Sequence, residues 1–311
     1  MSARVRSQSR RTRRTPGASS SWLARYGSPV SAIVMAALVV GIVVGNGPTL
    51  LVVGVVSLAS VLVAWGWPSL TDTHMGVLAQ VTTAFVGIAS ALVTALTHNF
   101  AQVAPVLGLG IGCAVAITLF FGPTPVDHSH VTRGDAPLPR AESSTSVHHS
   151  GALRMTANTI CAMAVTSTAA CWVALIDSPA WAPLAVPAGI IVAAVVLGDQ
   201  CGRSFRANSW GAVLVAVLVG VVLTVLASAM GQASTLPVVF GYIRHYLGPN
   251  VAAGLLGLVT GIVVACSVIA VDGLLGDHAR HGSRLGAAAR GCVKFLVSAV
   301  PVYAMIRVGA L

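Results

Sequence analysis

Residues 251–275 read VAAGLLGLVTGIVVACSVIAVDGLL, and Asp272 is the one charged residue in this stretch. An α-helix needs about 20 mainly apolar residues to cross a lipid bilayer. The stretch therefore predicts a transmembrane helix. Further segments of the same character occupy residues 30–44, 49–65, 75–96, 100–121, 156–176, 183–197, 210–230 and 288–308. They predict an all-α fold, a polytopic transmembrane helical bundle of about nine helices. Because segment 183–197 is short, eight helices are the alternative.

The composition leads to the same fold class. Of the 311 residues, 56% are apolar or aromatic and only 8% are charged, whereas soluble domains carry about a quarter charged residues. Too little polar surface is available for a water-soluble globule. The net charge of +10 comes almost entirely from Arg. These Arg residues lie at the ends of apolar segments rather than in one stripe, so we expect a lipid bilayer and not nucleic acid as the partner.

The distribution of basic residues predicts the orientation of the bundle. Loops on the cytoplasmic side of membrane helices carry an excess of Lys and Arg. With the N-terminus inside and nine crossings, the inner segments hold 14 Arg, and Arg290 and Lys294 follow just inside the last helix. Arg244 and Arg307 remain on the outer side. We therefore predict a multi-pass protein of the cell (plasma) membrane with a cytoplasmic N-terminus and an outer C-terminus.

Two polar segments divide the chain. Residues 1–29 are rich in Arg and Ser and predict a disordered basic cytoplasmic arm, which either contacts anionic lipid or only fixes the orientation. Residues 122–155 are rich in Pro, Ser and His and predict a flexible cytoplasmic linker. The linker separates a four-helix transmembrane block, residues 30–121, from a five-helix transmembrane block, residues 156–311.

Small residues at four-residue spacing indicate close helix packing. Lipid offers no hydrophobic drive for helix association, so helices meet through Gly pairs that let backbones approach. Such pairs are Gly41 with Gly45, Gly108 with Gly112, and Gly257 with Gly261. The pattern leaves open whether each pair packs inside one chain, against a protein partner or in a homo-oligomer.

Polar groups inside the apolar segments are candidates for function, because they are costly in a bilayer. Asp272 is the foremost, and its expected partners are Arg280, Arg284 or Lys294. Arg307 lies at the outer end of the last helix, where reaching toward water also explains it.

Two amides add to this set. The side chains of Gln80 and Asn158 are not easily satisfied within their own helices, so we expect them to face other helices. They form either interhelical hydrogen bonds or part of a polar lining for a solute path. Trp172 and Trp181 flank Asp177 and are expected at the membrane interface.

Known chemical motifs are missing from the sequence. There is no P-loop, no H-E-x-x-H and no G-x-S-x-G, and the single Glu is Glu142. The His residues of segment 122–155 lack the spacing of a metal site. We therefore predict no catalytic residues, no metal and no cofactor.

Three functions are consistent with this sequence. The first is a permease-like transporter of a small or lipophilic solute. The second is a non-catalytic membrane subunit or scaffold of a larger complex. The third is a lipid-modifying membrane enzyme whose inner face would use Asp272, Asp277, His278 and His281.

Overall fold

The computed structural model describes residues 18–73, 75–121, 144–200, 204–230, 245–276 and 283–309. These residues form helices joined by short connections, and no strand occurs among them. The prediction of an all-α polytopic bundle is therefore confirmed. The helices are α1 (Ala18–Val44), α2 (Thr49–Thr71), α3 (Val77–Thr97), η1 (Phe100–Gln102), α4 (Val103–Phe121), α5 (Ser144–Ser167), α6 (Ala169–Asp177), α7 (Ala182–Gly198), α8 (Phe205–Ala229), α10 (Pro249–Leu275) and α11 (Arg284–Gly309).

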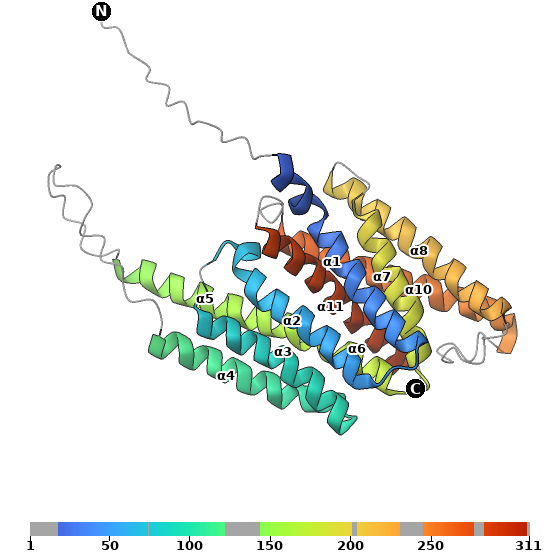
Figure 1. Ribbon diagram of the computed structural model, residues 1–311, viewed down its shortest axis with the longest axis horizontal. Helices are drawn as coiled ribbons and strands as arrows, with labels where there is room; N and C mark the ends of the chain where they lie inside the picture. Colours follow the sequence, from blue (N-terminus) through green and yellow to red (C-terminus); the bar gives the residue numbers. More distant parts are fainter. Residues whose placement is uncertain are drawn as a thin grey trace, which may run out of the picture.

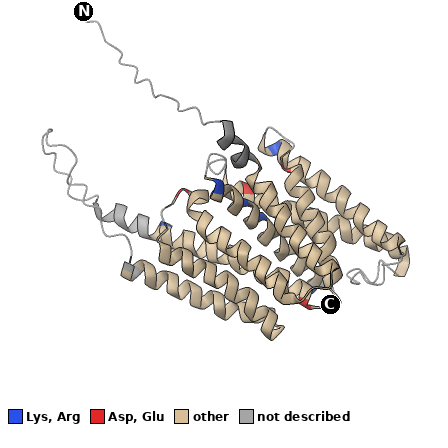
Figure 2. Cartoon of the chain, in the orientation of Figure 1, with Lys and Arg blue, Asp and Glu red and all other residues tan. Residues whose placement is uncertain are grey.

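The helices run roughly side by side, with α3 and α4 at one flank and α8 and α10 at the other (Figure 1). Eight spans in the described residues are long and apolar enough to cross a membrane, and α5 and α6 together make one of them. Charged residues gather toward the two ends of the bundle (Figure 2). The chain is a multi-pass membrane protein. We call its two ends the Arg284 end and the Arg307 end, after the positions on α11.

Helix α7 corresponds to the short apolar segment 183–197, which spans the membrane if the bundle has nine helices and does not if it has eight. It has 17 residues, which corresponds to about 25 Å of helix. Trp181, just before α7, lies 6.2 Å from the Tyr303 ring, whereas Asp199, just after α7, contacts Lys294. Because these contacts lie at well-separated levels of α11, α7 runs along α11 from the Arg307 end toward the Arg284 end.

The two sequence blocks share one core, because α11 packs against both α1 and α2. A Cβ at Gly66 of α2 would overlap Ala289, and a Cβ at Gly291 would overlap the Ser28 carbonyl oxygen of α1. Ser31 Oγ donates to the Ala288 carbonyl at 2.8 Å. Small residues thus bring α1 and α2 onto one side of α11.

The glycine pairs have different surroundings. A Cβ at Gly257 of α10 would overlap the Gly220 carbonyl oxygen of α8, and one at Gly261 would overlap Ala216. By contrast, a Cβ at Gly41, Gly108 or Gly112 would meet no atom within 4 Å, and a Cβ at Gly45 would meet only carbonyl oxygens of its own helix. Only the α10 pair therefore lies at a contact between helices of this chain.

Segment 156–176, expected as one helix, is interrupted at Thr168, between α5 and α6. Three consecutive hydroxyls, on Thr166, Ser167 and Thr168, donate to carbonyls three residues earlier. Side-chain bonds of this kind compete with the backbone ladder and bend helices. The Thr166 hydroxyl also lies 3.1 Å from the Thr83 carbonyl oxygen of α3.

Two helices, α1 and α5, begin well before their apolar runs do. α1 starts at Ala18 and α5 at Ser144, because a helix does not need apolar residues once it leaves the bilayer. The rest of the expected arm, residues 1–17, and of the expected linker, residues 122–143, lies outside the described residues.

Candidate functional site

The charged side chains that are buried among the described residues are Asp199, Asp272, Arg290 and Lys294. Their exposed fractions are 8%, 6%, 8% and 1%, respectively. Asp199 directly follows α7, Asp272 lies near the end of α10, and both cations belong to α11. We call these four residues the ion cluster.

Lys294 is the centre of the ion cluster. Its Nζ donates to Asp199 Oδ2 at 2.6 Å and lies 2.8 Å from Asp272 Oδ2. Arg290 donates to the other oxygen of Asp272, with Nε at 3.0 Å and Nη2 at 2.7 Å from Oδ1. Two cations face two carboxylates, so the ion cluster carries no net formal charge.

The fold places these side chains together for a local reason. Arg290 and Lys294 are four residues apart and therefore project from one face of α11. Gly291 and Ala288 contact α1, so the charged face is turned away from α1 and toward α7 and α10. Removing four charges from water is costly, and a buried network persists only when its members pair.

A pocket lies at the Arg307 end of the bundle, with a volume of about 410 Å³. Its walls come from α3, η1, α6, α11 and the connections next to them. The lining residues are Thr94, His98, Asn99, Phe100, Ala101, Ala174, Asp177, Ser178, Trp181, Tyr303 and Arg307. We call it the outer pocket, after the side of the membrane on which the sequence predicts Arg307 to lie.

One side of the outer pocket is a hydrogen-bonded contact between the ends of two helices. His98 Nδ1 lies 2.7 Å from Asp177 Oδ2, which ties the end of α3 to the end of α6. His98 closes α3 in the left-handed conformation, with φ at 52°. The Asn99 side chain then accepts a hydrogen bond from the Ala101 backbone N–H at 3.0 Å and starts η1.

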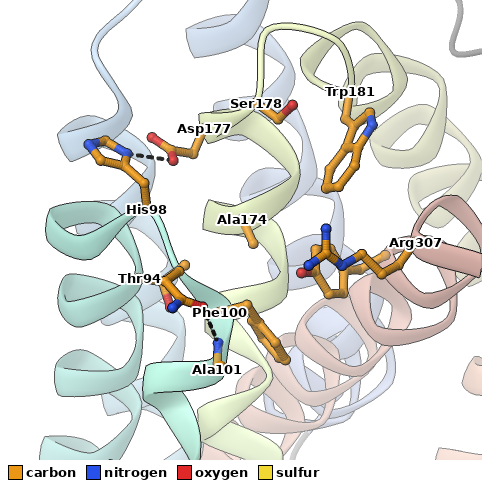
Figure 3. A pocket seen from close by; sticks show the side chains of 11 residues that line it. Thr94, His98, Phe100, Ala101, Ala174, Asp177, Ser178, Trp181 and Arg307 are labelled. Carbon is orange, nitrogen blue, oxygen red and sulfur yellow. Dashed lines mark hydrogen bonds and ion pairs between the residues drawn. The ribbon is translucent and has the colours of Figure 1, made fainter. Parts of the chain in front are cut away.

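The opposite side combines aromatic rings with a cation (Figure 3). The Tyr303 ring lies 4.8 Å from the Phe100 ring and 6.2 Å from the Trp181 ring, measured between centroids. The Arg307 guanidinium lies 5.8 Å from the centre of the Trp181 ring, within the range of a cation–π contact. This side can hold a flat apolar group and a negative charge.

Dense packing separates the outer pocket from the ion cluster. The Trp172 and Phe295 rings stack at 4.8 Å, and both side chains are fully buried. Trp172 Nε1 donates to the Phe295 carbonyl at 2.9 Å. Trp172 was expected at the membrane interface and instead lies in the core, because its N–H finds a partner there.

The four polar residues proposed from sequence do not form one site. Asp272 belongs to the ion cluster, with Lys294 among its expected partners, and Arg307 lines the outer pocket. Gln80 is half-buried and donates to the Met75 carbonyl at 3.3 Å, and Asn158 is half-buried on α5.

Sequence reasoning missed two members of the ion cluster. Arg290 was counted only toward the orientation, although its spacing of four from Lys294 signalled a shared face. Asp199 was not singled out, because it follows the apolar segment instead of interrupting it. Of the other expected partners of Asp272, Arg280 lies outside the described residues, and no ion pair joins Arg284 to Asp272.

The described residues hold no group of three or more His, Cys, Asp or Glu side chains that could bind a metal ion. Asp277, His278 and His281, named for the enzyme hypothesis, lie outside these residues. No protein family matches the chain, and neither a curated protein nor a solved structure is significantly similar to it. The function is therefore argued from the geometry alone.

Proposed function

We propose that the protein is a permease-like transporter of a small solute, with the Arg284 end in the cytoplasm. The observation that carries this proposal is the asymmetry of α11. At the Arg307 end the helix lines an open pocket, and farther along it is held to α7 and α10 by buried ion pairs. A transporter that is open to one side and closed to the other has this arrangement.

In this mechanism the ion cluster is the inner gate. Its pairs hold α7, α10 and α11 together, and opening toward the cytoplasm requires at least one of them to separate. Lys294 contacts both carboxylates and can keep one partner while it releases the other. Such an exchange never leaves Lys294 without a counter-ion, which lowers the cost of the motion in a low-dielectric interior.

Pro301 supplies a bending point between the gate and the outer pocket. It lies inside α11, and because proline has no N–H, the Val297 carbonyl lacks its usual helical donor. Sharp bends in helices concentrate at such positions. One half of α11 can therefore tilt while the other half keeps its contacts.

Transport by the purified protein in proteoliposomes tests the proposal. Radiolabelled benzoate, phenylalanine and glycerol represent an anionic, a zwitterionic and a neutral solute. We expect at least one to enter faster than into protein-free liposomes. Asp272→Asn removes the carboxylate that both cations share, so the inner gate can no longer close and the state that is open only to the outer side is lost. Uptake by alternating access should therefore slow by about tenfold or more.

Asp72→Asn is the matched control. Asp72 is exposed and closes α2 in the left-handed conformation, with φ at 49°, which Asn also adopts readily. Uptake should be unchanged in this variant. Equal uptake by the wild type, Asp272→Asn and protein-free liposomes for all three solutes would contradict transport of these classes.

The subunit or scaffold function is the second candidate, and the open side of α1 favours it. Apolar grooves of about 380 and 400 Å³ run beside Gly41, and a Cβ added at Gly41 would meet no atom within 4 Å. Native mass spectrometry of the protein extracted from its own host decides this point. A stoichiometric protein partner would support a subunit, whereas a lone chain would count against it.

A further inference from the structure

We infer that the outer pocket is a binding site for a small organic anion, a carboxylate attached to a flat apolar group. The inference rests on the proposed function only for the step from binding to transport. Binding itself depends on the residues of the outer pocket, at the end of the bundle away from the ion cluster.

The charge of the ligand follows from the pairing of the ionisable side chains. One oxygen of the Asp177 carboxylate already has a partner, because it lies 2.7 Å from His98 Nδ1. Arg307 has no acidic partner among the described residues, and its neighbours there include the Trp181 ring and Tyr303. No carboxylate of the described residues takes up the N–H donors of Arg307, and a guanidinium binds a carboxylate through two parallel N–H bonds.

The shape of the ligand follows from the aromatic side chains. Tyr303 is tilted by 42° to Phe100 and by 74° to Trp181, so the three rings form an angled wall rather than a closed stack. All three line the outer pocket next to Arg307. A flat apolar group can lie against this wall while its carboxylate reaches the guanidinium. The volume of about 410 Å³ falls within the usual range for small-molecule sites.

The orientation of the ligand follows from the layout in Figure 3. His98 and Asp177 lie on one side of the outer pocket, and Trp181 and Arg307 lie on the other. The Asp177 carboxylate repels an anion from its own side, which directs the ligand carboxylate toward Arg307. A ligand with an added ammonium group would instead gain from contact with Asp177.

Binding to the full chain in lipid nanodiscs tests the inference by saturation-transfer NMR. The probes are benzoate and 3-phenylpropionate, each compared with its uncharged amide. We expect each carboxylate to bind more tightly than its amide. Arg307→Gln should weaken carboxylate binding about tenfold, the loss typical of one charge-assisted hydrogen bond, and should leave amide binding unchanged.

Arg307→Lys and Arg284→Gln are the companion variants. Lys keeps the charge at position 307 but not the two parallel N–H donors, so we expect an affinity between those of the wild type and Arg307→Gln. Arg284 is an exposed residue of the same helix at its other end, so its replacement should not change binding. An equal loss in both Gln variants would overturn the inference, as would carboxylates that bind no better than their amides.

Asp177→Asn separates an anion from a zwitterion. Removing this carboxylate should strengthen the binding of 3-phenylpropionate or leave it unchanged. If phenylalanine binds more tightly than 3-phenylpropionate and loses this advantage in Asp177→Asn, the site takes zwitterions and the inference is wrong. Binding that depends on Arg307 but is not followed by uptake would uphold this inference and contradict transport. Uptake that is unchanged in Arg307→Gln would uphold transport and contradict this inference.

Discussion

Lys294 has the smallest exposed fraction of the four buried charges, at 1%, and it contacts both carboxylates of the ion cluster. We predict that Lys294→Met destabilises the protein by about 3–5 kcal/mol, because it leaves carboxylates buried with too few cations. Chemical unfolding in bicelles measures this loss.

Arg284→Met, an exposed change on the same helix, should have little effect. The pair Lys294→Met with Asp199→Asn should recover part of the loss, and a single variant as stable as the control would contradict the prediction.

At this scale the sequence shows which residues are unusual but not how they pair. Asp272 stands out because it interrupts an apolar run, and Lys294 because it is the only Lys. Their contact and the part played by Asp199 depend on how α7, α10 and α11 pack, and no local pattern encodes that packing. The residues of the outer pocket could not be grouped from local patterns either, because His98 and Asp177 meet there although they lie 79 positions apart in the sequence.

Where α8 packs on α10, a Cβ at Gly220 or at Gly257 would overlap the carbonyl oxygen of the other glycine. We predict that Gly257→Ala lowers stability by about 1–3 kcal/mol, because the added methyl group has no room. Gly108→Ala is the matched control, since a Cβ there meets no atom within 4 Å. It should leave the melting temperature unchanged or raise it slightly, because Ala favours a helix more than Gly does. Equal melting temperatures for the two variants would refute the prediction.

The elements themselves could be predicted well from hydropathy, because a bilayer requires long apolar helices. The interruption between α5 and α6 could not be predicted in this way, since Thr and Ser are common in unbroken membrane helices. The chain bends there because the hydroxyls of Thr166, Ser167 and Thr168 donate hydrogen bonds to carbonyls three residues earlier. Hydropathy does not predict which carbonyl a side-chain hydroxyl will bond.

For the whole molecule, the path of α7 decides the topology. We predict that Ala180→Cys and Ser204→Cys, on either side of α7, are labelled from opposite faces of the membrane. Both positions are exposed. In intact cells, with the native cysteines replaced, an impermeant maleimide should label the first at once and the second only after permeabilisation. Labelling of both from the same side would show that α7 does not cross, and the reverse pattern would invert the proposed orientation.

The long sequence separation within the ion cluster bears on how the protein is made. Asp199 and Lys294 lie 95 positions apart, so a ribosome delivers α7 and its carboxylate to the membrane well before the cation that neutralises it. Until α11 is inserted, Asp199 at the end of α7 lacks Lys294 as its counter-ion, so burial of this end among other helices is unfavourable. Insertion of α11 then brings both cations to the carboxylates of Asp199 and Asp272, so chains truncated before α11 would lack every ion pair of the cluster.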